Sequence, residues 1–490
     1  MRRVKSDQLQ LVFAASPSGG KSAEKPDVSG GRAFLLHIAS ARKIPDFIAP
    51  AAAPRRLLDE VASPLNLATA LLHVARNKGA AGVDGKSVGE VVADVSRLLP
   101  LLCEELLSGR YRPGDVRRVW IPKPGGGQRG LGIPNVVDRW VQQAVHQILA
   151  PIFEPEFHNS SHGFRSGRGA GTALPEATEH IAEGRTWVVG VDLSKFFDRV
   201  NHQRLLARMG QRISDACLLR LVHQMLKAKV VLPDGTQVSS TEGTPQGGPL
   251  SPLLSNIVLD ELDWEMERRG LHFVRYADDF NVYVRSKRAG QRVMAGLTHF
   301  IEGRMRLKVN IEKTELARSG RIHFLGFNLF TRRNGSIGIR LSARSRKRID
   351  TKIRELTPRN WGGSLDICFA KLNRYLKGWF GYFRLVTGAG ARLFKRIDAH
   401  IRRRIRAIIV LQRKRARFLA RHLESRGVSH RAAALSAYCS RGPWWKSNSV
   451  GMRQAYPNAW FHAGRLVSLW SCWEAVPSPA TASGQLRFDF

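Results

Sequence analysis

The chain has 490 residues, which is enough for roughly two to four domains with cores of their own. Its 78 Lys and Arg stand against 40 Asp and Glu, and the resulting formal charge of +38 implies a polyanionic partner, of which nucleic acid is the most common. A basic protein of the membrane surface is the alternative, but the sequence contains neither an apolar run of about 20 residues nor a lipidation signal.

The five cysteines are widely spaced and include no Cys-x-x-Cys pair. We expect reduced thiols in a cytoplasmic protein rather than a disulfide framework or a zinc site. The apolar patch at residues 11–15 is too short for a convincing secretory signal.

The first 60 residues are rich in Ala, Pro, Ser and Gly, which predicts a largely disordered extension with a short helix near Phe34–Ala41. Apolar residues then recur with helical spacing over Leu65–Arg76. Residues 77–85 follow as a glycine-rich loop, which taken alone is an ordinary connection.

Residues 119–134 have the pattern of a β-hairpin with a glycine-rich tip and cations on either side. Lys and Arg side chains there could clamp the triphosphate of an incoming nucleotide, because such a ligand needs positive charge that arrives as a loop closes. A solvated basic hairpin is the alternative.

An amphipathic helix is expected over Asp138–Ala150, followed by a polar, glycine-rich loop at residues 158–169. His158 and His162 have the i, i+4 spacing that suits zinc on a helix. Gly163 and the neighbouring serines argue against a helix, and therefore against zinc.

The apolar run Trp187–Asp192 predicts a strand that ends in an acid and leads into a helix start by Asp198. Phe197 follows Asp192 closely, and an aromatic ring there could pack under the sugar of a nucleotide and exclude a 2′-hydroxyl. The alternative for Phe197 is a core side chain.

A helical pattern over Leu205–Lys229 and a hairpin over Val230–Ser240 come next. Thr244–Gly248 is then expected to start a long helix that runs to about Arg268. Gln246 could hydrogen-bond a nucleotide while the glycines permit close backbone approach, and a simple helix N-terminal turn is a compatible alternative.

Apolar and polar residues alternate on both sides of Ala277-Asp278-Asp279, which predicts a hairpin over Phe273–Val284 with two carboxylates at its tip. Burying two adjacent Asp is costly unless a cation offsets their repulsion, so a divalent-metal site is one interpretation and a solvated turn is the other. Asp192 offers a third acid from a neighbouring strand. Three such carboxylates could hold two Mg²⁺ ions that activate an attacking hydroxyl and stabilise a leaving pyrophosphate.

A helix over Gly290–Met305, a strand over Leu307–Ile311 and a strand pair at Ile322–Phe327 are expected next. Leu341–His430 then carries 24 Lys and Arg against 5 Asp and Glu, a net charge of +19 that is half of the chain's excess. Three successive basic helical segments look like a phosphate-binding surface. An apolar stripe lies between the cations of the last segment, at Ile397, Ile401, Ile405, Ile408 and Ile409.

Tyr276-Ala277-Asp278-Asp279, the strand that ends at Asp192 and the motif at residues 243–252 together strongly resemble the palm of reverse transcriptases. The chain is most similar to bacterial group II intron-encoded reverse transcriptase/maturases, over about residues 60 to 470. Residues 372–383 resemble their thumb, or maturase X, domain. Residues 441–470 resemble their small DNA-binding region more weakly, and the additional tryptophans Trp445, Trp460 and Trp473 could stack on bases or form a small core.

The resemblance implies a role for each candidate site residue. The catalytic acids, which would hold two Mg²⁺ ions, are Asp192, Asp278 and Asp279. The nucleotide-binding residues are Lys123 and Arg129 on the phosphates, Phe197 at the sugar and Gln246. The primer and template residues are Arg165, Lys313, Leu325 and Gly326. Gly130 departs from the family, which usually has Pro after the Arg, and this leaves the rigidity of the hairpin open.

We therefore predict an α+β right-hand polymerase with a helical thumb. Its expected parts are an N-terminal extension (1–60), fingers and palm (61–340), a thumb/maturase X domain (341–430), a DNA-binding region (431–475) and a disordered tail (476–490). No His-Asn-His or Cys-pair endonuclease module follows, so we expect an endonuclease-lacking type that does not nick a target strand itself.

The implied activity is RNA-directed DNA polymerisation, in which a primer 3′-hydroxyl attacks the α-phosphate of a deoxynucleotide on an RNA template. The implied partners are a group II intron RNA, whose splicing and mobility the protein would assist, an RNA template with a DNA primer, and target DNA, with no membrane. Two alternatives stay open. One is a host-domesticated reverse transcriptase in phage defence or DNA repair, and the other is an RNA-binding splicing factor with a vestigial palm.

Overall fold

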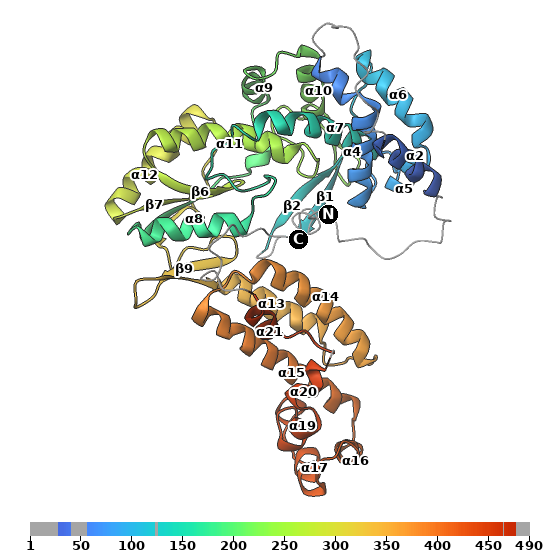
Figure 1. Cartoon of the computed structure of the whole chain (residues 1–490), viewed down its shortest axis with the longest axis vertical. Coiled ribbons are helices and arrows are strands. Elements are labelled where there is room, and N and C mark those ends of the chain that lie inside the picture. Colours follow the sequence, from blue (N-terminus) through green and yellow to red (C-terminus); the bar gives the residue numbers. More distant parts are fainter. Residues whose placement is uncertain (1–27, 41–55, 123–125, 464, 477–490) are drawn as a thin grey trace. The chain divides into compact units, whose positions relative to one another are not determined.

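The computed structural model describes residues 28–40, 56–122, 126–463 and 465–476 (Figure 1). These residues divide into two compact units. The first unit takes them from Met1–Ala177 and Val189–Leu316, and the second from Thr178–Val188 and Ala317–Phe488. Lys123, residues 477–490 of the predicted tail and most of the predicted N-terminal extension lie outside the described residues.

Helices that precede or flank the fingers form one part of the first unit. They are α2 (Ser29–Ser40), α3 (Leu57–Val61), α4 (Pro64–Arg76), α5 (Val88–Ala93), α6 (Val95–Leu107) and α7 (Val136–Phe153). Trp140 of α7 is fully buried, and its indole Nε1 donates to Leu67 O of α4 at 2.7 Å. α2 packs against α4 with Leu35 fully buried. The short helix expected in the extension is therefore present and begins at Ser29.

The fingers hairpin has the predicted form. Strand β1 (Val116–Pro122) pairs antiparallel with β2 (Gln128–Ile133), and Trp120 lies opposite Gly130. The hairpin expected at Val230–Ser240 is also present, as β4 (Val230–Val231) and β5 (Gln237–Val238), and it extends the sheet to the order β2-β1-β4-β5.

The structure gives a reason for the unusual glycine in this hairpin. A Cβ at Gly130 would lie 2.6 Å from Arg118 Nη1 and 3.1 Å from the Trp120 ring. Arg118 Nη1 also donates to Gly130 O at 3.1 Å. The arginine and tryptophan of β1 thus occupy the space that a larger residue would need.

The palm sheet has the order β6-β7-β3-β8. Its strands are β3 (Trp187–Asp192), β6 (His272–Tyr276), β7 (Asp279–Val284) and β8 (Glu315–Arg318). The predicted hairpin is confirmed, because β6 and β7 pair antiparallel with Tyr276 opposite Asp279 and leave Ala277 and Asp278 as the turn. Phe280 and Val282 of β7 point into the core of the first unit.

Three predicted elements differ from the structure. The helix expected over Leu205–Lys229 is two helices, α9 (His202–Gly210) and α10 (Ala216–Leu226), because the Asp215 side chain caps α10 by accepting from the backbone N of Cys217 and Leu218. The long helix α11 begins at Ser251, not at Thr244, and ends at Arg268. The strand expected over Leu307–Ile311 is reduced to one bridge between Val309 and Leu193.

Three further helical elements remain, and the first of them is divided between the two units. α8 (Ala170–Ala182) precedes β3, and the short 3₁₀ turn η2 (Phe196–Asp198) follows it. α12 (Lys287–His299) continues into a π-helical turn at Phe300–Arg304, which agrees with the helix expected there.

A buried ion pair holds the palm hairpin on α11. Arg275 of β6 and Asp263 of α11 are both fully buried, and their guanidinium and carboxylate groups meet at 2.5 to 3.0 Å. The remaining Arg275 donors reach Asn256 Oδ1 at 3.0 Å, Ala277 O at 3.1 Å and Ser161 Oγ at 2.6 Å. This one side chain therefore connects α11, the turn and the loop before α8.

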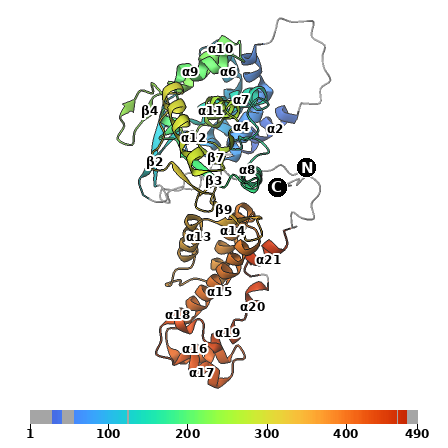
Figure 2. The same cartoon turned by 90° about the vertical axis from the view of Figure 1, so that its left-hand side faces the viewer.

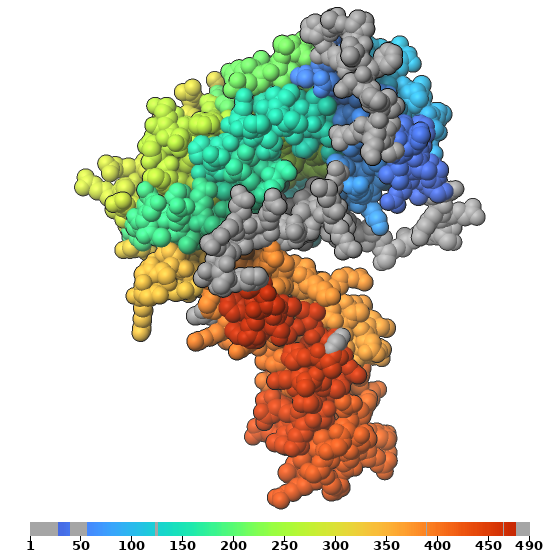
Figure 3. Space-filling model, viewed as in Figure 1, coloured from blue at the N-terminus to red at the C-terminus, as the bar shows by residue number. Residues whose placement is uncertain are grey.

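The second unit consists of a hairpin and a set of helices. The hairpin is β9 (Phe327–Thr331) with β10 (Ile337–Leu341), and a 3₁₀ turn lies at Gly388–Ala391. The helices are α13 (Ala343–Leu356), α14 (Leu365–Phe383), α15 (Arg392–Gln412), α16 (Ala416–Glu424), α17 (His430–Ala437), α18 (Pro443–Lys446), α19 (Val450–Ala455), α20 (Asn458–His462) and α21 (Leu469–Glu474). Figure 3 shows the later helices, in orange and red, as one packed body.

Helix α15 is the central helix of this unit. Helices α16, α17, α18 and α19 lie near its C-terminal end (Figure 2). The predicted apolar stripe is confirmed, since all five isoleucines from Ile397 to Ile409 are buried. Asp398 of the same helix accepts hydrogen bonds from the backbone N of Leu469 and Trp470 and so holds the start of α21.

The three additional tryptophans do not share one environment. The Trp460 ring packs edge-on against Tyr456 and Phe461, and Trp473 Nε1 donates to Val386 O at 2.8 Å. Trp445 has 42% of its surface exposed. Trp460 and Trp473 thus belong to a small core, whereas Trp445 is open to a partner. Of the described helices, none is long and apolar enough to span a bilayer.

Removing the Asp263 carboxylate should destabilise the first unit strongly. Asp263→Ala leaves the Arg275 charge buried without its counterion, and a loss of about 3–5 kcal/mol is expected. Urea unfolding of the purified chain measures it. The matched control is Glu104→Ala, which removes the exposed ion pair with Arg110 and should cost at most about 1 kcal/mol. Equal unfolding midpoints for the two variants would contradict the role given to Arg275.

Candidate active site

Three carboxylates at one end of the palm sheet are near enough to interact electrostatically, although they do not form a closely grouped set of metal ligands in the described chain. Asp278 lies in the β6–β7 turn, Asp279 is the first residue of β7, and Asp192 is the last residue of the neighbouring strand β3. Burial, and then the charge of Asp192, raise the pKa of Asp278. The structure therefore brings together the three acids that the sequence analysis singled out, which we call the palm acids.

Asp279 has the most perturbed carboxyl of the three. Burial and the charges of Asp278 and Asp192 raise its pKa to about 7. Its side chain is nevertheless accessible to water. Because the residue is exposed, screening by water limits how much of this pKa shift contributes to stability.

Two cations and one amide surround the palm acids. Lys313 Nζ lies 3.2 Å from Asp192 Oδ2, and Asn310 Nδ2 donates to the same oxygen at 3.1 Å. The charges of Arg129 and Lys313 oppose the rise in the pKa of Asp278. Arg129 comes from the fingers hairpin, so that hairpin contributes positive charge to the acid cluster. Asn310 was missed in the sequence, where only Lys313 nearby pointed to this segment.

The turn that carries Asp278 is held in a strained conformation. Ala277 has a φ of 58°, in the left-handed region. A Cβ at Gly163 would lie 2.2 Å from Ala277 N, so only glycine fits against the turn. Asn256 Nδ2 donates to Gly163 O at 2.9 Å, and Arg275 donates to Ala277 O. These buried contacts fix the conformation of the turn that carries the Asp278 carboxylate, and no local pattern in the sequence signals them.

Residues 243–250 connect the fingers to the palm, and we call them the nucleotide loop after the role predicted for Gln246. Gly132 N of β2 donates to Gln246 O at 2.8 Å, and Thr244 N donates to Phe197 O at 2.6 Å. Gly247 has a φ of 134°, and a Cβ there would lie 2.5 Å from Gly132 O. The loop thus places Gln246 and Phe197 on one backbone framework, and both side chains are half-buried.

The Arg165 side chain is buried and contacts only other residues of the protein. Its side chain is only 6% exposed and makes an ion pair with Glu154 at 2.9 Å. Its other hydrogen bonds go to the carbonyls of Glu154, His158 and Ser161. The side chain therefore braces the loop before α8, and its burial leaves little of it for the direct contact with a template that the resemblance implies.

Leu325 and Gly326 belong to the second unit. The strand expected over Ile322–Phe327 is a turn there, since both residues have positive φ values of 51° and 88°. Leu325 O accepts from Tyr382 Oη at 3.1 Å, and Gly326 O accepts from Ser345 Oγ at 2.8 Å. The turn is thus fixed on α13 and α14, and its contact with a primer stays a prediction.

The two histidines considered for zinc have protein partners. His162 contacts Glu176 at 2.8 Å and Thr172 at 2.9 Å, and His158 packs against Phe273. Within the described ranges, no three His, Cys, Asp or Glu side chains are grouped closely enough to hold a metal ion. Mg²⁺ usually takes one or two protein carboxylates and completes its shell with water and substrate phosphates. Asp192 and Asp278 fit that mode of binding.

Asp279 should make the stability of the chain depend on pH. Because folding raises the pKa of its carboxyl from 3.8 to about 7, the folded state loses stability as the pH rises through this range. Without divalent metal, Asp279→Asn should therefore unfold at a higher urea concentration than the wild type at pH 8, with the difference vanishing near pH 4.

Asp234 supplies a control of opposite sign. Hydrogen bonds from Thr236 lower the pKa of its exposed carboxyl, so Asp234→Asn should not stabilise the chain at pH 8. A similar stabilisation in both variants would refute the special environment of Asp279.

The family comparisons agree with the geometry. The model "Reverse transcriptase (RNA-dependent DNA polymerase)" matches residues 121–329, which include all three palm acids. The model "Group II intron, maturase-specific domain" matches residues 346–427, over α13 to α16.

Several curated proteins are similar to this chain. Protein YkfC of Escherichia coli is 35% identical over 322 residues, which are 57% of this chain and 84% of YkfC. The group II intron-encoded protein LtrA of Lactococcus lactis is 31% identical over 303 residues, which are 48% of this chain and 50% of LtrA. The putative COX1/OXI3 intron 1 protein of Saccharomyces cerevisiae is 36% identical over 33% of this chain and 19% of its own length. The chain belongs to the group II intron family of reverse transcriptases with a maturase domain, whose enzymatic part is an RNA-directed DNA polymerase.

Proposed function

We propose that the protein copies RNA into DNA at the palm acids and assists the splicing and mobility of a group II intron RNA. The observation that carries the polymerase proposal is the meeting of Asp192, Asp278 and Asp279 beside Lys313 and Arg129. A negative cluster with cations at its edge is better explained as a site for a metal-bound triphosphate than as part of a structural core.

Asp192 and Asp278 would hold two Mg²⁺ ions together with the triphosphate of the nucleotide. Such ions favour the ionised form of a primer hydroxyl and neutralise the charge on the leaving pyrophosphate. Lys313 and Asn310 orient the Asp192 carboxylate through their contacts at 3.2 and 3.1 Å. This leaves Asp192 free to turn only its second oxygen toward a ligand.

The fingers and the nucleotide loop would bind the substrate. Arg129, and Lys123 by the family resemblance, would contact the triphosphate, and Gln246 would contact the base or sugar. Phe197 is held beside the nucleotide loop through its own carbonyl. Its ring would lie under the ribose and exclude a 2′-hydroxyl, which makes the product DNA.

The second unit would bind the nucleic-acid partners. Basic residues flank the buried stripe of isoleucines on α15 and the buried Ile349 and Ile353 on α13, so one side of each helix packs while the other presents cations. We assign the intron RNA and the template-primer duplex to this surface, and target DNA to the helices after α16. We expect the protein to act in the cytoplasm.

Asp278→Asn should abolish primer extension. The change keeps the shape of the turn but removes a charge that a metal ion needs, and extension of a DNA primer on an RNA template should fall by at least about 100-fold. Asp234→Asn makes the same substitution in the exposed β4–β5 turn and should extend like the wild type. If wild type and Asp278→Asn both fail to extend while both bind RNA tightly, the splicing-factor alternative is correct.

Phe197→Ala should relax the choice of sugar. Removing the ring opens space beside the ribose, and incorporation of ribonucleotides relative to deoxynucleotides should rise by about 10- to 100-fold. Phe197→Tyr keeps a flat ring of similar size and is the matched control, so it should still exclude ribonucleotides. An unchanged ratio in Phe197→Ala would mean that this ring is only a core side chain.

A further inference from the structure

A small pocket lies in the second unit, where α15 ends and α16 and α18 begin. Its volume is about 300 Å³. Apolar side chains form much of its lining, namely Val410, Leu411, Ala416, Leu419 and Pro443. The same pocket is also lined by Arg413, Lys414, Arg415, Arg441 and Lys446. It therefore combines an apolar floor with an unusually basic rim.

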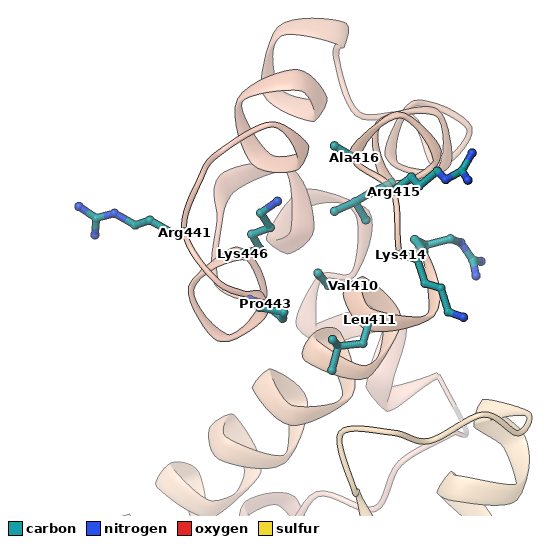
Figure 4. A pocket seen from close by; sticks show the side chains of 10 residues that line it. Val410, Leu411, Lys414, Arg415, Ala416, Arg441, Pro443 and Lys446 are labelled. Atoms are coloured by element: carbon teal, nitrogen blue, oxygen red, sulfur yellow. The ribbon is translucent and has the colours of Figure 1, made fainter.

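The cations stand on two sides of the pocket. Figure 4 shows Arg441 extending on one side and Lys414 and Arg415 on the other, with Val410 and Leu411 between them. None of these three cations is paired with a carboxylate of the described chain. Residues 410–446 contain nine Lys and Arg and a single acid, Glu424, which pairs with His430. The charge around the mouth is thus largely uncompensated.

The segment that closes the pocket is held rigidly. The Trp444 ring packs under the Arg403 guanidinium at 4.1 Å, and Arg403 Nη2 donates to Trp444 O at 3.1 Å. Lys446 Nζ donates to Ala437 O at 2.7 Å, which leaves it a structural cation. The pocket is therefore preformed and does not need a ligand to assemble it.

An exposed aromatic residue continues the basic side of the rim. The Arg441 guanidinium lies 5.2 Å from the centre of the Trp445 ring, and Trp445 is partly exposed. An arginine beside an open indole is a common surface for stacking a nucleobase. A simple inorganic anion would need the cations but not the apolar floor or this ring.

We propose that this pocket holds one unpaired nucleotide of a bound nucleic-acid strand. The base lies on the floor formed by Val410, Leu411 and Pro443. The strand crosses the mouth, so its flanking phosphates meet Arg441 on one side and Lys414 and Arg415 on the other. This inference rests on the nucleic-acid binding part of the proposed function, and it assigns that binding a specific unpaired position.

Photocrosslinking of the full chain tests the pocket directly. The probes are short single-stranded oligonucleotides with one central photoreactive base, 4-thiouridine in RNA or 4-thiothymidine in DNA, and the adducts are located by mass spectrometry. We expect adducts within residues 410–419 or 441–446. The same photoreactive base paired in a duplex should give none there, because a paired base cannot enter the pocket.

Two matched pairs of variants distinguish the pocket from general charge attraction. Ala416→Trp fills the cavity and should lower the adduct yield at these residues about tenfold, whereas Leu435→Trp adds the same ring at an exposed position outside the lining and should not. Arg441→Gln should lower the yield, whereas Arg431→Gln, an exposed cation outside the lining, should leave it unchanged.

The outcomes are distinct from those of the polymerase test. Ala416 begins α16 and lies outside α13 and α15, to which the template-primer duplex is assigned, so Ala416→Trp should extend primers like the wild type. Adducts with RNA alone would identify an RNA strand as the occupant, and adducts with DNA alone a DNA strand. If the wild type forms adducts in the pocket but extends no primer, the proposed polymerase activity is refuted and this inference stands. Adducts only elsewhere, or full yield in Ala416→Trp, would overturn it.

Discussion

The geometry of the active site depends on the buried ion pair between Arg275 and Asp263. Taking two charges out of water costs several kcal/mol for each ion unless hydrogen bonds satisfy them, and here the remaining donors of Arg275 bind Asn256, Ser161 and the carbonyl of Ala277. The pair therefore fixes the position of the palm hairpin in addition to balancing charge. The pair connects the strained turn of the palm hairpin to α11. The direction of the Asp278 carboxylate therefore depends on these buried contacts.

The palm acids form a negative site within a strongly positive protein. The raised pKa values of Asp278 and Asp279 show that their charges are not fully compensated by the chain itself. Lys313 pairs with one oxygen of Asp192 at 3.2 Å and offsets part of the negative charge of the cluster. In the proposed function a divalent cation would complete this balance, and the excess of Lys and Arg in the chain would attract the polyanionic partner.

Most strands and helices could be predicted because their signals are local. Alternation around Asp278 and the apolar run before Asp192 directly reflect strands with one or two buried faces. The Arg275–Asp263 pair and the Asn310–Asp192 contact could not be predicted, because they join segments that are distant in sequence and have no common pattern. The break between α9 and α10 is an intermediate case. Asp215 is a clear capping residue, but because apolar residues recur with helical spacing on both sides of it, the pattern indicated one continuous helix.

The nucleotide loop shows why the start of α11 was misplaced. Thr244–Gly248 has helix-starting residues, yet Gly243 and Gly247 adopt positive φ values that a helix does not permit. Instead of helical hydrogen bonds, the backbone of the loop makes hydrogen bonds with β2 on one side and with Phe197 on the other. A helix would have satisfied those backbone groups internally and left fingers and palm unconnected at this point. The irregular loop thus connects β2, Gln246 and Phe197 through its backbone, as the proposed nucleotide site requires.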